Sequence, residues 1–164
     1  IIERDCVFEE NMDLTVKAKG DLDIDLHHTN EDVGLVVGQA LDRALGDRKG
    51  ITRFGWAYVP MEEALARVVL DISGRPKLLF TDARSPGAPT RRLSSSASYR
   101  WEDAEHFLES VTRSAKLTLH ISVLAGTDFH HTCEAVFKAL GRALETATRF
   151  HPRVRGIPSS KGRL

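Results

Sequence analysis

The stretch "LHHTNEDVG", Leu26–Gly34, decides the fold, because its pattern occurs twice in the chain. The stretch "FHHTCEAVF", Phe129–Phe137, repeats His-His-Thr-x-Glu at the same five positions. Each copy leads into an apolar run with helical spacing, which indicates an amphipathic helix. Two copies in one chain predict an internal duplication.

The duplication extends on both sides of these stretches. One offset of 103 positions (130 − 27) pairs Gly38 with Gly141 and Leu14-Thr15 with Leu117-Thr118. A strand, a connection, the His-His-Thr-x-Glu element and a helix therefore recur without a net gap. We expect an α+β domain over residues 1–164, built from two tandem duplicated halves, each a small β-sheet packed against amphipathic helices. The halves are placed at about 13–80 and 101–150, with a tail at 151–164.

Local patterns predict the remaining elements. Alternating apolar and polar residues, or short apolar runs, indicate strands, and longer periodic runs indicate helices. The predicted strands are 13–18, 51–59, 66–73, 77–81 and 116–124, and the predicted helices are 29–45, 101–115 and 131–149. A turn of helix is expected at 61–65 and a loop at 85–98. Thr29 is a candidate cap for the first helix.

Composition excludes several classes of partner. The chain has 164 residues, and 23 Lys+Arg balance 23 Asp+Glu. This balance leaves no general basic surface for nucleic acid and no polybasic membrane signal. No apolar run is long enough to span a bilayer. Cys6 and Cys133 lack CxxC spacing, and residues 1–20 lack a secretory pattern, so we expect an intracellular protein with reduced thiols.

Histidine and glutamate in the repeated element are good ligands for divalent metals. A single His-x-x-x-Glu pair on a helix is usually an ion pair or a hydrogen bond, but two matching copies favour a metal site. A pseudo-symmetric centre could collect four histidines and two glutamates, a set suited to manganese, iron, cobalt or zinc. If the helix includes the whole element, Glu31 faces both histidines from one turn away. If Thr29 is the cap, the histidines precede the helix.

Other polar residues suggest further contacts. The repeat pairs Lys17 with His120, so the second half carries one more imidazole, either as a third metal ligand or as an ordinary strand histidine. His106 and His151 have no such context and are expected at the surface. The stretches "SGRP" (73–76) and "PSSKG" (158–162) combine a cation with hydroxyl and backbone N–H groups, which suits a phosphate.

Five stretches together carry a family resemblance: "GDLDIDLHHTNEDVG" (20–34), "RFGWAYVPMEEALARVVLDISGRP" (53–76), "LTLHISVLAG" (117–126), "HHTCEAVFKALGRAL" (130–144) and "IPSSKG" (157–162). In this order they resemble the imidazoleglycerol-phosphate dehydratases, over about residues 13–80 and 101–164. The resemblance implies a hydro-lyase that converts imidazole glycerol phosphate to imidazole acetol phosphate in L-histidine biosynthesis. It also implies two manganese(II) ions per active site and a fold like the ribosomal protein S5 domain 2.

The resemblance further implies a large symmetric homo-oligomer with active sites between subunits, located in the cytoplasm or, in a plant, the plastid stroma. It assigns one ion to His27, His120, His130 and Glu134, and most of the other ligand set to His28, Glu31 and His131. Glu31 or Glu134 would move protons. The substrate phosphate would contact Arg75, Arg92, Ser159 and Lys161.

Two departures from the family pattern lead to an alternative function. The family's N-terminal Gly-Phe-Leu-Asp-His-Met motif has no counterpart in residues 1–12, so the second ligand set is expected to lack one histidine. Leu26 stands where the family has a polar residue beside its ligands. The alternative is a truncated, catalytically weak or inactive paralogue that acts as an oligomer subunit or a metal-binding protein. A metal-dependent hydrolase fits the ligands but not the full set of motifs.

Overall fold

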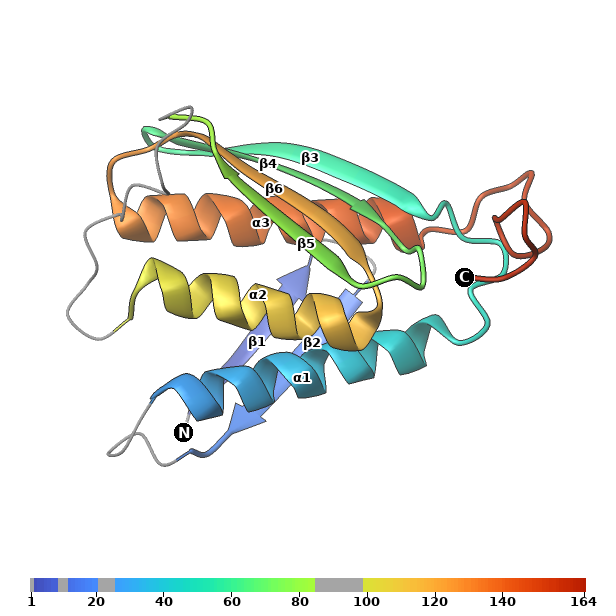
Figure 1. Cartoon of the computed structure of the whole chain (residues 1–164), viewed down its shortest axis with the longest axis horizontal. Coiled ribbons are helices and arrows are strands. Elements are labelled where there is room, and N and C mark those ends of the chain that lie inside the picture. Colours follow the sequence, from blue (N-terminus) through green and yellow to red (C-terminus); the bar gives the residue numbers. More distant parts are fainter. Residues whose placement is uncertain (1, 9–11, 21–25, 85–98) are drawn as a thin grey trace.

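Six strands and three helices lie in the described part of the chain, residues 2–8, 12–20, 26–84 and 99–164 of a computed structural model (Figure 1). In chain order they are β1 (Ile2–Phe8), β2 (Met12–Ala18), α1 (Leu26–Leu45), β3 (Phe54–Met61), β4 (Ala64–Asp71), β5 (Lys77–Asp82), α2 (Trp101–Ala115), β6 (Thr118–Ala125) and α3 (Phe129–Thr148). The predicted α+β class is confirmed.

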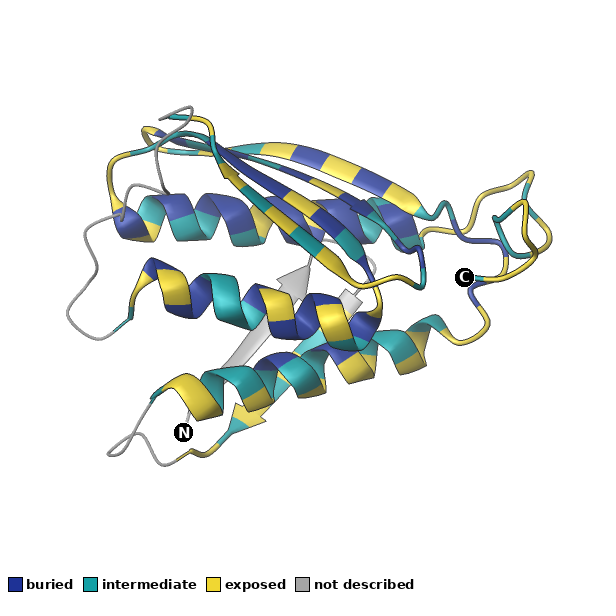
Figure 2. Cartoon of the chain, viewed as in Figure 1, coloured by how far each residue is buried: buried dark blue, intermediate teal, exposed yellow. Residues whose placement is uncertain are grey.

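The main sheet has four strands in the order β3-β4-β6-β5. The β3–β4 and β4–β6 pairs are antiparallel and the β5–β6 pair is parallel, so the sheet is mixed. The sheet combines β6 with β3, β4 and β5, which lie in the first predicted half except for the last two residues of β5, and therefore joins segments from both predicted halves. More buried and less buried residues alternate along β3 and β4, as expected where one sheet face is covered (Figure 2).

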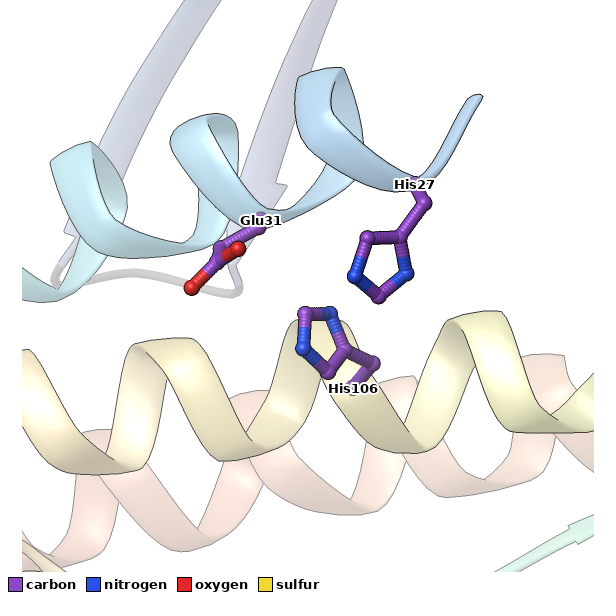
Figure 3. A group of neighbouring side chains, drawn as sticks. All are labelled: His27, Glu31 and His106. Carbon is purple, nitrogen blue, oxygen red and sulfur yellow. The ribbon is translucent and has the colours of Figure 1, made fainter. Parts of the chain in front are cut away.

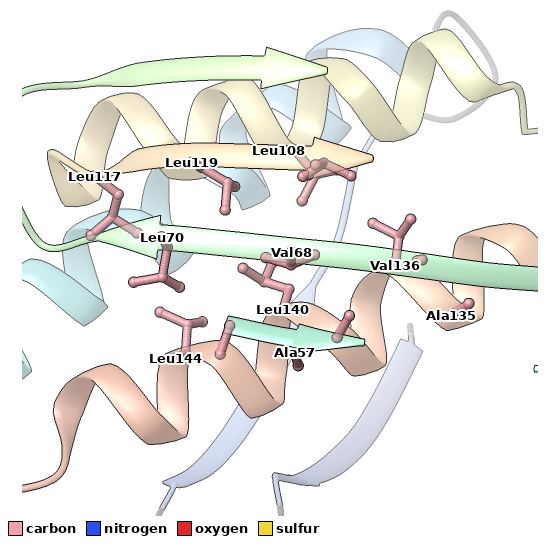
Figure 4. Packing of buried hydrophobic residues seen from close by; sticks show 14 of the residues in the cluster. Ala57, Val68, Leu70, Leu108, Leu117, Leu119, Ala135, Val136, Leu140 and Leu144 are labelled. Carbon is pink, nitrogen blue, oxygen red and sulfur yellow. The ribbon is translucent and has the colours of Figure 1, made fainter. Parts of the chain in front are cut away.

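The hydrophobic core lies between this sheet and the helices α2 and α3. Figure 4 shows Val68 and Leu70 of β4 facing Leu140 and Leu144 of α3. Each fully buried leucine or valine contributes about 1.5–3 kcal/mol relative to an exposed one. Gly55 of β3 allows a close approach, since a side chain there would collide with the Ala143 carbonyl oxygen. This core fixes α3, which carries the second His-His-Thr-x-Glu element.

Helix α1 carries the first element and packs on α2, on the side of α2 away from the sheet (Figure 1). The antiparallel pair β1–β2 forms a separate sheet, and β2 lines a groove together with α1. Both α1 and α3 have 20 residues, and the repeat offset relates their first residues (129 − 26 = 103) and their last ones (148 − 45 = 103). The two elements therefore occupy equivalent positions on their helices.

The structure corrects two local predictions. Helix α1 begins at Leu26, so Thr29 lies inside the helix and does not cap it. The whole first element thus lies within one helix, which is the first of the two arrangements considered, and Glu31 lies close to His27. The predicted helical turn at 61–65 is wrong: Met61 pairs with Ala64, and residues 62–63 form a two-residue hairpin turn. The loop predicted at 85–98 lies outside the described residues.

Candidate functional site

The first part of the site depends on a close contact between α1 and α2. A side chain at Gly34 would lie 2.9 Å from the Phe107 carbonyl oxygen, and one at Gly38 would lie 2.6 Å from that of Val111. Both contacts are tighter than a Cβ atom tolerates, so glycine is needed for this approach. Near the start of α1, the amide of Asn30 donates to the Asp103 carbonyl oxygen over 2.7 Å. These contacts bring the first turn of α1 against α2.

His27, Glu31 and His106 meet at this contact. Their potential ligand atoms all lie within 4.8 Å of one another, a combination able to hold a metal ion (Figure 3). His27 and Glu31 are four positions apart, so they share one face of α1. The rings of His27 and His106 stack with centroids 4.2 Å apart at 28°. Two elements distant in sequence thus supply two imidazoles and a carboxylate.

The donor set fits a manganese ion. Buried His106 Nδ1 has no hydrogen-bond partner among the described residues. A buried polar atom without a partner is costly, and a metal would satisfy it. Imidazole nitrogen and carboxylate oxygen suit divalent manganese, iron, cobalt or zinc. His27, Glu31 and His106 would be the residues that hold such an ion.

His106 was missed by sequence reasoning, which expected it at the surface. It is half-buried and faces α1. The structure does not bring His120 to this group. His120 is exposed on β6, on the sheet face opposite buried Leu119 and Ile121, and those residues face the helices. His106, rather than His120, therefore lies beside His27. His151, also expected at the surface, is exposed.

Glu31 also pairs with Arg113, and this pairing affects how readily Glu31 can bind a metal ion. Arg113 Nη2 donates to Glu31 Oε1 over 3.0 Å, and the Arg113 side chain is 58% exposed. An exposed pair of this kind contributes little to stability and is easily exchanged. Glu31 can therefore move from Arg113 to a nearby cation without a large cost.

His28 points elsewhere. Successive residues of a helix are rotated by about a quarter turn or more, so adjacent histidines face different surroundings. His28 lines the groove between β2 and α1, a space of about 620 Å³ to which Lys17, Lys19 and Asp32 also contribute. The two neighbouring histidines of the first element therefore face different sides of α1.

The second His-His-Thr-x-Glu element lies on the first turns of α3. His130 Nε2 is 3.2 Å from Glu134 Oε2, and the His130 side chain is 80% exposed. Lys138 Nζ is 2.7 Å from the other Glu134 oxygen. The hydrogen bond from Lys138 is the main cause that lowers the pKa of Glu134, which is therefore an ionised carboxylate near neutral pH. This pair faces solvent and is open to a further ligand.

His131 turns to a different partner. Its Nδ1 lies 2.8 Å from Oε2 of Glu63, a residue of the β3–β4 turn. The backbone N–H of His131 donates to Asp128 Oδ1 over 2.9 Å, and Asp128 caps α3. The hydrogen bond to Glu63 is the main cause that raises the pKa of His131. Sequence reasoning gave Glu63 no role.

The two elements do not form one centre within the chain. Among the described residues, the only group of three or more potential ligands combines His27, Glu31 and His106. His130, His131 and Glu134 lie at the start of α3, on the other side of α2 from α1 (Figure 1). The pseudo-symmetric centre with four histidines and two glutamates is therefore not present in a single copy.

The predicted phosphate contacts lie at the opposite end of the sheet from the start of α3. Arg75, Ser159 and Lys161 occur in two segments that meet, since the end of Leu164 packs against Gly74. Arg75, which follows Gly74, and Lys161 are both exposed. Ser159 Oγ accepts a hydrogen bond from the Lys161 backbone N–H over 3.2 Å. Arg92 lies outside the described residues.

Arg53 joins these two segments and was also missed from the sequence. Its guanidinium holds both oxygens of Asp71, at 2.6 and 3.0 Å, and donates to the Pro158 carbonyl oxygen at 2.7 Å. Asp71 ends β4 just before "SGRP", and Pro158 begins "PSSKG". Arg53 therefore anchors the tail beside the turn that carries Arg75.

Comparison with known proteins identifies the family of the chain. Residues 5–144 match the family model described as imidazoleglycerol-phosphate dehydratase. The chain is 53% identical over 152 residues to the imidazoleglycerol-phosphate dehydratase of Bacillus subtilis, covering 93% of this chain and 75% of that protein. It is 52% identical over 153 residues to the chloroplastic enzyme of Pisum sativum, covering 93% of this chain and 52% of that protein.

Solved structures give the same result. The crystal structure of imidazoleglycerol-phosphate dehydratase from Staphylococcus aureus superposes with a TM-score of 0.69 at 40% sequence identity. The superposition covers 82% of this chain and 72% of that one. In sequence and in fold, the chain therefore belongs to the imidazoleglycerol-phosphate dehydratase family, a family of hydro-lyases.

Proposed function

We propose that this protein dehydrates imidazole glycerol phosphate to imidazole acetol phosphate in L-histidine biosynthesis, and that it uses manganese(II), two ions per active site. The observation that carries the metal proposal is the group of His27, Glu31 and His106, with its buried, unpartnered imidazole nitrogen. The relatives' shared name supports the reaction. Identity of about one half to named enzymes favours an active enzyme over an inactive paralogue.

The reaction needs help because the proton to be removed is on a carbon with no adjacent carbonyl. When bound, the metal would act as a Lewis acid on the substrate imidazole, so that the ring can accept and return electrons. A carboxylate must then take the proton and another group must protonate the departing hydroxyl. Glu31 and Glu134 are the candidates, since each is a partly exposed carboxylate with exchangeable partners.

The two ligand groups support an active site shared between copies of the chain. One copy presents His27, Glu31 and His106 between its helices, and presents His130 and Glu134 separately, facing solvent. An imidazole and a carboxylate exposed together can complete the ligand shell of another copy's ion. We therefore propose self-association into a large symmetric homo-oligomer, in which metal binding and assembly support each other.

The phosphate of the substrate is proposed to bind where the "SGRP" turn meets the tail. Arg75 and Lys161 supply charge, and Ser159 supplies a hydroxyl. Arg53 holds the two segments together through Asp71 and Pro158. Since this region lies at the opposite end of the fold from the first turns of α1 (Figure 1), a substrate spanning both regions also favours a site between copies.

The finer fold description is part of the proposal. Equal lengths and equivalent bounds of α1 and α3 support two duplicated halves of the ribosomal protein S5 domain 2-like kind. No described helix is both long and apolar enough to cross a membrane. The cytoplasm, or the plastid stroma in a plant, is the proposed location, and the latter is supported by the chloroplastic relative in pea.

A reconstitution assay tests the proposed function. The purified chain is stripped with a chelator, reloaded with manganese, and mixed with imidazole glycerol phosphate. We expect product only after reloading. Turnover that survives chelation would contradict the metal requirement, and a manganese-loaded protein that forms no imidazole acetol phosphate would contradict the activity.

A further inference from the structure

We propose that Glu63 is a positioning residue that fixes the imidazole of His131. The Glu63 carboxylate engages Nδ1 of that ring, which leaves Nε2 for a ligand. The inference rests on the proposed function in one respect, namely that this ligand is a metal. Glu63 lies in the β3–β4 turn, 68 positions from His131 in sequence, and reaches the start of α3 across the fold.

Glu63 is itself held firmly. Its Oε1 accepts hydrogen bonds from the backbone N–H of Asp128 at 2.8 Å and of Thr127 at 3.0 Å, and from Thr127 Oγ1 at 3.3 Å. The backbone N–H groups just before a helix are fixed in direction by the fold. One oxygen of Glu63 is thereby fully used, and the other is placed 2.8 Å from His131 Nδ1.

His131 is also held by the backbone. Its N–H donates to the Asp128 side chain, so the residue cannot shift along the helix without breaking the cap. The ring remains one-third exposed, at 33% of its side chain. The ring therefore has a fixed position, one engaged nitrogen and access from solvent.

A carboxylate selects one tautomer of this ring. An ionised carboxylate can only accept hydrogen bonds, so the neutral imidazole must carry its proton on Nδ1, and Nε2 keeps its lone pair. Imidazoles that bind metals usually donate their other N–H to a carboxylate or carbonyl in this way. Glu63 thus prepares His131 for metal before any metal arrives.

The variant Glu63→Gln tests this with minimal change in shape. Glutamine offers one acceptor oxygen, which the N–H groups of Thr127 and Asp128 require. Its NH₂ group then faces Nδ1, which must become the acceptor, so the proton moves to Nε2 and blocks the lone pair. We expect manganese affinity to fall about 10- to 100-fold, the usual effect of losing such a partner.

The matched control is Glu62→Gln, on the same turn. It removes an equal charge near His131, and Glu62 makes no side-chain hydrogen bond to His131 in the described structure. We expect near-normal manganese affinity for this variant. Equal losses in the two variants would show that only charge matters and would overturn the positioning role.

The tautomer is measured directly by nitrogen-15 NMR of the histidine rings in the metal-free protein, above the pKa of His131. We expect Nδ1–H for wild-type His131 and Nε2–H in Glu63→Gln. A wild-type ring with its proton on Nε2 overturns the inference, even if the glutamine variant does not fold. Failure of the chain to bind manganese would instead refute the proposed metal, while the ring spectra still decide the role of Glu63.

Discussion

His27 and His106 stack ring on ring, 4.2 Å between centroids, across the contact of α1 with α2. This pair, with Glu31, is the proposed metal-binding group. We expect His106→Ala to abolish manganese binding at this group, because it removes the buried imidazole nitrogen of His106. His120→Ala is the control and should bind manganese as the wild type does, because His120 faces away from this group. Metal content after dialysis, measured by mass spectrometry, separates them; equal loss in both variants would contradict the assignment.

Metal binding should also stabilise the fold. A ligand that binds only the native state adds stability by mass action, about 2.7 kcal/mol at a hundredfold excess over its Kd. We therefore expect manganese to raise the melting temperature of the wild-type chain and a chelator to lower it. The His106→Ala variant should show little response. A wild-type melting temperature insensitive to manganese would argue against a resident ion.

The contact of α1 with α2 should be intolerant of a side chain at Gly38. A Cβ atom there would lie 2.6 Å from the Val111 carbonyl oxygen, which belongs to helix backbone and cannot easily move. We expect Gly38→Ala to cost about 1–3 kcal/mol of unfolding free energy, as overpacking does. It should also weaken manganese binding, because His27 would move away from His106.

Gly156→Ala is the control for that substitution. A side chain at Gly156 meets nothing within 4 Å. Urea unfolding of both variants gives the comparison. If Gly38→Ala is as stable as Gly156→Ala, the close helix contact is not a constraint.

The tail should contribute to phosphate affinity through Lys161. We expect Lys161→Ala to weaken binding of inorganic phosphate in calorimetry by about tenfold, the typical effect of losing a charge-assisted contact of about 1.4 kcal/mol. Manganese content should not change. Arg153→Ala, an exposed cation in the same tail, should have little effect. Undiminished phosphate binding by Lys161→Ala would remove this residue from the site.

The Glu63–His131 pair predicts a pH dependence of stability in the metal-free chain. Hydrogen bonds from the Asp128 backbone, His131 and the Thr127 backbone lower the pKa of Glu63 from its usual 4.5. The contribution of Glu63 to the free energy of unfolding is thus complete above pH 4.5, and it is lost as the pH falls through the lowered pKa. The pKa of His131 is raised, so the contribution of His131 to the free energy of unfolding is complete below pH 6.5. This contribution is lost as the pH rises through the raised pKa.

The stability advantage of the wild type over Glu63→Gln should therefore be largest between the two ordinary values, 4.5 and 6.5. It should shrink on either side. Urea unfolding of both proteins across roughly pH 3 to 9 measures this difference. A difference that does not vary with pH would mean that the pair is not an ion pair in the folded state.

The parts of the fold that follow from periodicity were predictable. Helix α2 has the predicted bounds, Trp101–Ala115, because its apolar stripe is clear. The repeat placed both His-His-Thr-x-Glu elements at helix starts. The hairpin at residues 62–63 was not predictable in the same way, since two glutamates carry no turn signal. Tertiary contacts, here the hydrogen bonds that Glu63 accepts from the backbone N–H groups of Thr127 and Asp128, stabilise that turn.

The candidate site was only partly predictable. His27 and Glu31 stand out because they repeat, whereas His106 lies on α2, outside the repeated unit, and becomes visible only when α1 packs against it. The sequence did hold one signal for the orientation of His120. A strand alternates its faces, so His120 points away from its apolar neighbours Leu119 and Ile121, which are buried against the helices. Arg53 and Glu63 act across long sequence separations, which a local pattern does not record.

The most direct test of the metal centre is the manganese position in a crystal of the metal-loaded protein, located by anomalous scattering. The account predicts a manganese peak at bonding distance from one nitrogen of His27 and one of His106, with a carboxylate oxygen completing the group. Manganese bound elsewhere, at His120 for example, with neither His27 nor His106 in contact, would contradict it.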